Sequence, residues 1–203
     1  MEEKDIYKTI TIPSPEVLYK DKKSKFYGYA FPIASEDEIK PLITALKNKH
    51  HTANHICYAW QLGVENITYR ANDDGEPNNS AGKPIYGQIK SFEVTNLLVA
   101  VARVFGGTKL GVGGLITAYK SAAQMALESA TIVTKTLQQN FLIFFDYKEM
   151  NTVMRVIKQH KIKIIAQKLE TNCSYTIAVQ KQEAKQIHVI FSAMQHISIA
   201  ELD

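Results

Sequence analysis

Hydrophobic and polar positions alternate along several short stretches of the chain, with the period of a half-buried β-strand. This pattern predicts strands at residues 6–12, 26–33 and 56–62, and a short one at residues 68–71. The segment from Leu97 to Arg103 is instead continuously apolar and rich in β-branched residues, which is typical of a strand buried on both faces. The first two thirds of the chain therefore contain a sheet.

Helical periodicity appears three times in the same region. Residues 35–38 read Ser-Glu-Asp-Glu, a capping box that opens a helix with one apolar face. Residues 85–92 predict a short helix, and residues 115–130 predict a long helix rich in alanine. The small side chains of the long helix would let it pack close to a sheet. The polar run of residues 20–25 is taken as the segment that precedes the second strand.

The pattern changes after Ala130. The remaining elements follow the order strand, helix, strand, strand, helix, strand, which is the ferredoxin-like arrangement. We therefore predict an α+β protein of two domains, residues 1–130 and residues 131–203. In the second domain, residues 131–137 and 140–145 are strand-like and precede the first helix, at residues 147–160. Strands at residues 162–169 and 175–179, a helix at residues 183–195 and a last strand at residues 197–202 follow.

Composition fits a globular protein, since 45% of the 203 residues are hydrophobic and 22% are charged. The net charge of +4 permits contact with nucleic acid without demanding it. The amino terminus lacks the pattern of a signal peptide, and no apolar run is long enough to cross a bilayer, so no membrane partner is expected. Cys57 and Cys173 are far apart in sequence, so a reducing cytoplasm is the expected setting.

Two loops carry most of the information about function, at residues 72–84 and 103–115. Five of the ten glycines lie between Gly106 and Gly114. Glycines between a strand and a helix can aim backbone N–H groups at an anion, or they can simply let the chain turn and the helix pack. No P-loop or dinucleotide fingerprint is present. The candidate anion- or nucleic-acid-binding residues are Arg103, Gly106, Gly107, Lys109, Gly111, Gly113 and Gly114.

The first loop reads DDGEP and then AGKP, and the second reads Arg-Val-Phe-Gly-Gly-Thr-Lys-Leu-Gly-Val-Gly-Gly-Leu. Together these strings resemble the signature of the IMPACT/YigZ family, as do residues 24–26 and 53–59. The resemblance implies a first domain folded like the second domain of ribosomal protein S-five. It also implies a ferredoxin-like second domain similar to a carboxyl-terminal domain of elongation factor G. The motif residues of the first loop are Asp73, Asp74, Gly75, Glu76, Pro77, Ala81, Gly82 and Lys83.

The chain departs from the family pattern at three positions. Asn78 and Asn79 stand in a segment of Ser-Gly-Thr type, and Thr117 stands where an arginine commonly precedes Ala-Tyr. The loss of hydroxyl groups and of a cation weakens the case for phosphate binding through side chains at these positions.

The resemblance implies a noncatalytic RNA- or ribosome-associated protein that influences translation, because the eukaryotic IMPACT proteins regulate translation through a protein partner. Two alternatives stay open. One is an enzyme that uses the carboxylates of Asp73, Asp74 and Glu76 for acid–base chemistry beside the glycine loop. The other is a protein-interaction module. No cofactor and no metal are expected, because the spacing of His50, His51, His55 and Cys57 matches no standard zinc site.

Overall fold

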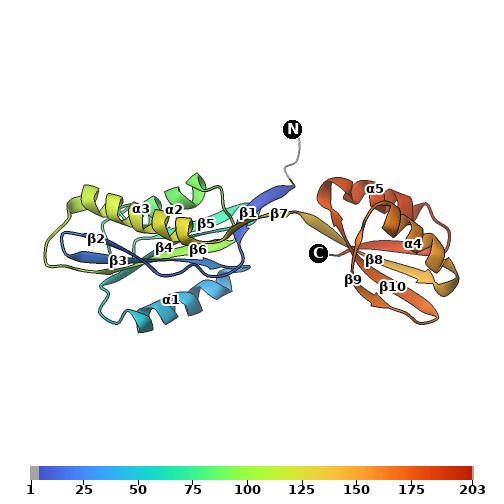
Figure 1. Cartoon of the computed structure of the whole chain (residues 1–203), viewed down its shortest axis with the longest axis horizontal. Helices are drawn as coiled ribbons and strands as arrows, with labels where there is room; N and C mark the ends of the chain where they lie inside the picture. The colour runs from blue at the N-terminus through green and yellow to red at the C-terminus, as the bar shows by residue number, and fades with distance from the viewer. Residues whose placement is uncertain (1–4, 203) are drawn as a thin grey trace. The chain divides into compact units, whose positions relative to one another are not determined.

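The computed structural model describes residues 5–202 of the chain, which form two compact units. The first unit consists of residues 7–135, and the second consists of residues 136–202 together with residues 5 and 6 (Figure 1). Residues 1–4 are not described. The prediction that the amino terminus lacks a signal peptide therefore falls partly outside the described residues. None of the described helices combines the length and apolarity needed to cross a membrane.

The first unit is built on a five-stranded antiparallel sheet in which the central strand is almost completely buried. That strand is β6 (Leu97–Val104), and only its last residue is partly exposed. This confirms the prediction from its unbroken apolar run. The strand order is β2 (Val17–Asp21), β3 (Ser24–Pro32), β6, β4 (His55–Leu62) and β5 (Thr68–Asn72).

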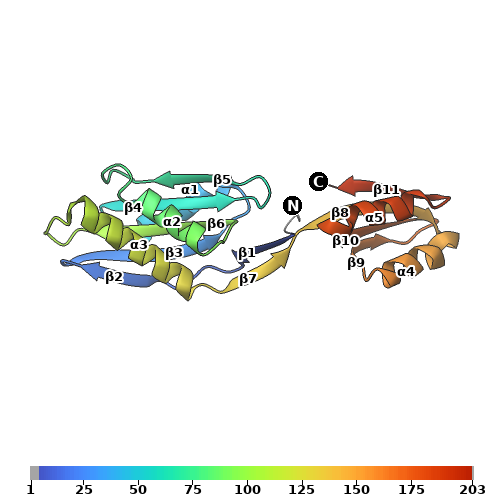
Figure 2. The same ribbon diagram turned by 90° about the horizontal axis from the view of Figure 1, so that it is seen from above.

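Helices cover both faces of this sheet (Figure 1 and Figure 2). One face packs against α2 (Gly82–Ser91) and α3 (Gly111–Ser129), and the other carries α1 (Ile39–Lys49) after the short 3-10 turn Glu36–Glu38. The expected close packing of the alanine-rich helix is confirmed. A Cβ at Gly28 of β3 would lie 2.6 Å from the Ala122 carbonyl oxygen of α3.

The capping box predicted at the start of the first helix is present between Ser35 and Glu38. The Glu38 Oε1 accepts hydrogen bonds from the backbone N–H groups of Ala34 at 2.8 Å and Ser35 at 3.1 Å. The sequence prediction of this helix start is therefore confirmed, although its first turn is a 3-10 turn.

The hairpin formed by β2 and β3 differs from the prediction. The sequence pattern predicts only a polar segment at residues 20–25 before the strand, whereas these residues pair with each other around a turn at Lys22 and Lys23. Both turn residues have positive φ, 42° and 68°, in a region that glycine usually occupies. Periodicity did not reveal the hairpin, because its turn contains no glycine and its edge strand carries lysine.

A two-stranded ribbon of β1 (Ile6–Ile10) and β7 (Ile132–Thr136) completes the packing of the first unit. Ile10 is 2% exposed in the core that lies beneath α2 and α3, and Ile132 packs against the same core. Strand β7 follows Ala130, the residue at which we predicted the domain boundary. The separate folding of the two domains remains a prediction.

The second unit has a four-stranded antiparallel sheet in the order β11 (Ile197–Leu202), β8 (Gln138–Asp146), β10 (Asn172–Gln180), β9 (Lys163–Lys168). Both of its helices, α4 (Met150–Gln159) and α5 (Lys181–Ser192), lie on one face. This is the ferredoxin-like arrangement, so the predicted α+β fold class is confirmed. The Asp5 carboxylate accepts a hydrogen bond of 2.6 Å from the Gln182 N–H in the first turn of α5. The turn Tyr147–Glu149 lies between β8 and α4.

Cutting the chain between the units should leave the first unit folded. A fragment of residues 1–135 keeps the β1–β7 ribbon, so it should unfold cooperatively on heating and give dispersed amide signals by NMR. A fragment that ends at Ala130 loses β7 and the apolar contact of Ile132, which should cost about 1–2 kcal/mol. Its Tm should therefore fall by roughly 5 °C. A disordered 1–135 fragment beside an ordered full chain would contradict separate folding.

Candidate nucleic-acid interface

Asp73 of the DDGEP loop caps the helix that follows it. Its Oδ1 accepts hydrogen bonds from the N–H groups of Ala81 at 3.0 Å and Gly82 at 2.8 Å, and its Oδ2 accepts one from Asn79 at 2.8 Å. These N–H groups lie at the amino end of α2, where helix donors have no partner within the helix. A Cβ at Gly82 would lie 2.5 Å from the Asn72 nitrogen, so this close contact requires glycine.

Asp74 ties the same loop to the first residues of β4. Its Oδ2 accepts a hydrogen bond of 2.7 Å from the Ile56 N–H, and its carbonyl oxygen accepts one of 2.7 Å from His55 Nδ1. Gly75 follows with a φ of 87°, a conformation that favours glycine. Two of the three DDGEP carboxylates thus hold the loop in place.

Glu76 is buried and binds two partners from different elements. Its Oε1 accepts hydrogen bonds from Arg103 Nη1 at 2.5 Å and from the Tyr119 hydroxyl at 2.8 Å. The side chains of Glu76 and Arg103 are only 4% and 8% exposed. The Arg103 guanidinium also lies over the rings of Phe26 and Phe105, at 5.6 and 5.5 Å from their centroids. Arg103 therefore joins the base of the glycine loop to the DDGEP loop, and its charge faces inward.

This pairing changes the role expected for Arg103. We predicted it among the residues that add positive charge for an anion, whereas the structure places it in the interior with Glu76 as its counter-ion. A cation near a strand end can either face an external anion or pair with a carboxylate of the chain. In this structure the buried Glu76 carboxylate of the DDGEP loop is the partner of Arg103. Tyr119, the third member of this cluster, belongs to the Ala-Tyr pair of the family pattern, but it was not among the residues predicted for the site.

Tyr119 and the neighbouring Cys57 are both held in their protonated forms. Burial raises the pKa of the Cys57 thiol and of the Tyr119 phenol well above their usual ranges. The Cys57 thiol donates a hydrogen bond of 3.0 Å to the Asp73 carbonyl oxygen. Cys57 is fully buried in β4, and neither group is a ready nucleophile or base at neutral pH.

The glycine loop rests on the turn of the β2–β3 hairpin. The Gly106 N–H donates a hydrogen bond of 3.1 Å to Ser24 Oγ, and a Cβ at Gly106 would lie 2.1 Å from the Lys23 carbonyl carbon. Only glycine fits between these segments. Gly107 follows with a φ of 86°, and the exposed Lys109 lies just before the helix.

The last glycines of the motif belong to the first turn of α3 rather than to the loop. The helix begins at Gly111, so Gly113 and Gly114 are helical, and the predicted start at residue 115 was too late. Glycine disfavours helices, which is why periodicity did not extend to these residues. No side chain among the described residues caps this end of α3. The N–H groups of its first turn therefore lack partners within the helix.

One end of the first unit is positively charged. The hairpin contributes the exposed lysines Lys22, Lys23 and Lys25, and the glycine loop contributes Lys109. None of the four makes an ion pair with any other described residue. We call these lysines and the first turn of α3 the basic end. Sequence reasoning had included only Lys109, although four lysines between residues 20 and 25 were visible.

The other motif residues lie at the start of α2. Lys83 is exposed in its first turn, Ala81 is fully buried, and the Pro77 carbonyl oxygen accepts hydrogen bonds from the backbone and side chain of Ser80. The structure thus brings Glu76 and Arg103 into contact and places Lys109 with lysines of the hairpin.

The buried pair is expected to be a source of stability. Replacing Arg103 with Ala leaves Glu76 buried without a counter-ion, which should cost about 3–5 kcal/mol of unfolding free energy. Tyr119→Phe removes one hydrogen bond to a charged group and should cost about 1.5–3 kcal/mol. Lys109→Ala, at an exposed position, should change stability by no more than about 0.5 kcal/mol. Urea unfolding of the three variants measures these differences, and equal stability of Arg103→Ala and Lys109→Ala would exclude the structural role.

Comparison with known proteins gives the family of the chain. Residues 22–127 match the family model of the Impact N-terminal domain. The chain is 28% identical over 162 residues to the IMPACT family member YvyE of Bacillus subtilis, covering 80% of this chain and 75% of the relative. It is 30% identical over 151 residues to the IMPACT family member YigZ of Escherichia coli, covering 73% and 74%.

The fold agrees with a solved structure over nearly the whole chain. A crystal structure described as that of a hypothetical protein superposes with a TM-score of 0.67 at 22% identity, covering 98% of both chains. This likeness concerns the fold alone. The matched region of the family model contains the DDGEP loop, the glycine loop and, from Lys22 onward, the turn and second strand of the hairpin. The chain therefore belongs to the IMPACT family.

Proposed function

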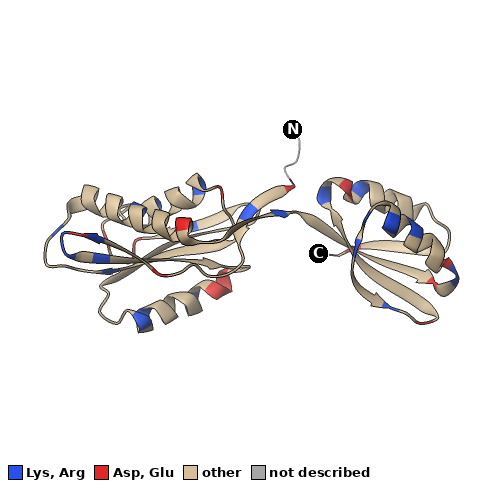
Figure 3. Cartoon of the chain, viewed as in Figure 1, with Lys and Arg blue, Asp and Glu red and all other residues tan. Residues whose placement is uncertain are grey.

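We propose that this chain is a noncatalytic RNA- or ribosome-associated regulator of translation that acts in the cytoplasm and contacts phosphate groups through its basic end. The observation that carries the proposal is the contact of the lysine hairpin with Gly106, in the loop that leads to the open amino end of α3 at Gly111. Figure 3 shows the lysines of the hairpin beside the loop that leads into α3. Fixed cations and unpartnered helix N–H groups are the two features that bind phosphate in proteins.

The glycine at position 113 supports a ligand that approaches the backbone. No described atom would lie within 4 Å of a Cβ at Gly113, and its φ is not in the left-handed region. Neither packing nor conformation therefore requires glycine here, although glycine weakens a helix. An open backbone in the first turn of α3 leaves room for a phosphate oxygen.

The DDGEP loop favours binding over catalysis. Asp73, Asp74 and Glu76 each accept hydrogen bonds from the chain itself, and Glu76 has Arg103 as a buried partner. A general base needs a carboxylate that can reach a substrate proton. The structural use of these carboxylates is a reason to prefer the binding role to the enzymatic one.

A protein partner is the second candidate, and exposed apolar side chains favour it. Val112 and Ile116 of α3 are 52% and 39% exposed, and they share a helix face because they are four residues apart. Phe105 of the glycine loop is 42% exposed. The eukaryotic IMPACT proteins, which this chain resembles, regulate translation through a protein partner.

Binding to RNA should be weak and sensitive to salt. We expect dissociation constants in the micromolar range at low ionic strength, with an affinity that falls as salt rises because bound phosphates release counterions. The triple variant Lys22→Ala, Lys23→Ala, Lys109→Ala should bind about 10- to 100-fold more weakly to all RNA sequences. Fluorescence anisotropy with labelled RNA at several salt concentrations measures both effects.

A matched control uses lysines of α2. The double variant Lys83→Ala, Lys90→Ala removes two exposed cations of α2 and should keep its affinity within about twofold. If the wild-type chain shows no salt-sensitive binding to RNA, the RNA proposal fails and the protein-interaction role becomes the preferred one.

A pair of glycine variants tests backbone binding directly. Gly113→Ala and Gly87→Ala both place a methyl group in open space on a helix, so each should stabilise the fold by up to about 1 kcal/mol. Only Gly113→Ala, in the first turn of α3, should weaken RNA binding. Equal affinities of the two variants would show that phosphate does not approach the α3 backbone.

A further inference from the structure

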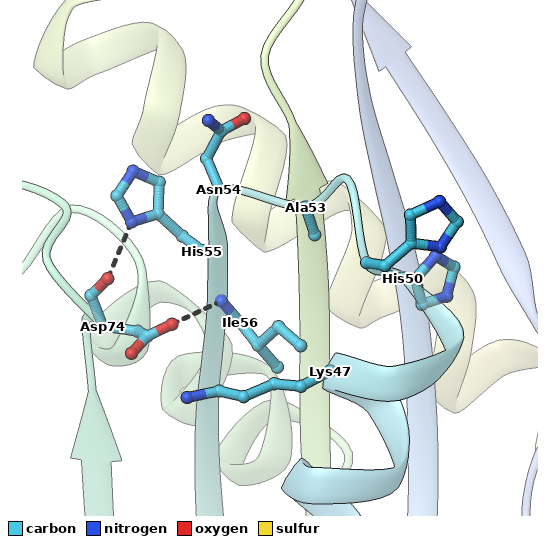
Figure 4. A pocket seen from close by; sticks show the side chains of 8 residues that line it. Lys47, His50, Ala53, Asn54, His55, Ile56 and Asp74 are labelled. Atoms are coloured by element: carbon cyan, nitrogen blue, oxygen red, sulfur yellow. Dashed lines mark hydrogen bonds between the residues drawn. The ribbon is translucent and has the colours of Figure 1, made fainter.

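A groove runs between α1 and the strands β4 and β5 on the face of the sheet opposite to α2 and α3. It consists of two open hollows of about 460 and 350 Å³ that share Lys47 as a lining residue. In Figure 4, Lys47 of α1 and Asp74 of the loop after β5 extend over Ile56 of β4. The groove is therefore bounded by the helix on one side and by the DDGEP loop and β5 on the other.

The cations of the groove come from both of its sides. Lys40 and Lys47 lie seven residues apart on α1, about 10 Å along the helix axis. Arg70 of β5 pairs in register with Trp60 of β4 and lines the second hollow. None of these three makes an ion pair with any residue that the structure describes. The lining also includes two carboxylates, Glu36 and Asp74, of which Asp74 binds the Ile56 N–H.

Groups suited to nucleic-acid bases lie between these cations. The Asn54 Oδ1 accepts a hydrogen bond of 3.0 Å from the Phe105 N–H, which leaves its amide NH₂ as a donor. His55 Nδ1 donates to the Asp74 carbonyl oxygen, so Nε2 of the neutral ring is an acceptor. The partly buried ring of Tyr58 lines the second hollow. Single-stranded RNA is bound through hydrogen bonds to its base edges, stacking of its bases on aromatic rings and cations on its phosphates. The groove contains all three kinds of group.

The wall of this groove is fixed to the sheet. The Tyr29 hydroxyl of β3 contacts both Glu16 and His50, and Glu16 forms an ion pair of 2.8 Å with Lys49 at the end of α1. Burial lowers the pKa of His50, so this ring adds no fixed charge at neutral pH. The positive charge of the groove therefore comes from its two lysines and its arginine.

The groove is continuous with the glycine loop through one hydrogen bond. Asn54, which lines the first hollow, binds the N–H of Phe105, the residue that precedes Gly106. A strand that contacts the basic end can thus continue past Phe105 into the groove. A duplex cannot follow this path, because its two strands form a wide convex surface, whereas the hollows admit single bases.

We infer that the groove between α1 and β4–β5 binds a single-stranded segment of RNA, with Lys40, Lys47 and Arg70 on its phosphates. This inference rests on the proposed function, since it extends the RNA contact from the basic end. It also predicts selectivity, because the basic end alone would not distinguish single strands from duplexes. An acidic polypeptide would need the cations but not the base-directed groups.

The test compares labelled single-stranded and duplex RNA of about 12 nucleotides, within the site sizes of single-strand binders. The double variant Lys47→Ala, Arg70→Ala should bind the single strand about tenfold more weakly than the wild type, and its affinity for the duplex should stay within about twofold. The slope of log affinity against log salt should become shallower by about 1.4, since each lost phosphate contact removes about 0.7. The Lys83→Ala, Lys90→Ala variant serves as the control.

The outcomes separate this inference from the proposed function. A wild-type chain that binds neither RNA overturns both. Salt-sensitive binding that the groove variant leaves unchanged overturns only the groove, and so does equal loss for single strand and duplex. Loss of binding to poly-glutamate with unchanged RNA binding would assign the groove to an acidic protein partner. Photocrosslinking of 4-thiouridine RNA to the wild-type chain should label a peptide that contains Asn54 or Tyr58, and labelling confined to other peptides would contradict the path.

Discussion

Arg103 and Glu76 form an ion pair in the interior of the first unit, where each side chain is less than a tenth exposed. A buried charge is costly unless it is paired, so each residue fixes the position of the other. Arg103 is the penultimate residue of the central strand, Glu76 belongs to the DDGEP loop, and Tyr119 of α3 binds the same carboxylate oxygen. The strand, the loop and the helix are thereby held together at one point.

The family motif therefore combines two kinds of residue. Asp73, Gly82, Glu76 and Arg103 shape the scaffold, because their hydrogen bonds and close contacts stay within the chain. Gly113 has no such internal requirement, and its backbone lies open at the start of a long helix. In sequence, the acidic residues and glycines of this motif resemble a catalytic site. In the structure, the carboxylates of the motif hold its loops in place. The positions that remain available to a ligand are few and lie beside lysines.

Two surfaces of the first unit meet at Phe105. The basic end lies on one side of it, with the lysine hairpin under Gly106, and the groove beside α1 begins on the other side at Asn54. Phosphate contacts set affinity without reading sequence, whereas a groove with base-directed groups can distinguish single strands from duplexes. In the function proposed above, this division is what selects the form of RNA, although the net charge of the chain is only +4.

Local patterns in the sequence determined the main elements, the ferredoxin-like second domain and the family motif, because helical and strand periods are properties of neighbouring residues. Only the tertiary structure decided what the motif does. Glu76 lies 27 residues from Arg103 and 43 from Tyr119, and Ser24 lies 82 residues from Gly106, so no local period encodes these contacts. The hairpin of β2 and β3 was missed for a related reason, since its turn uses lysines at positive φ in place of glycine. From the sequence, Arg103 and Lys109 were both candidates for binding an anion. The structure distinguishes them, because Arg103 is buried against the Glu76 carboxylate and Lys109 is exposed.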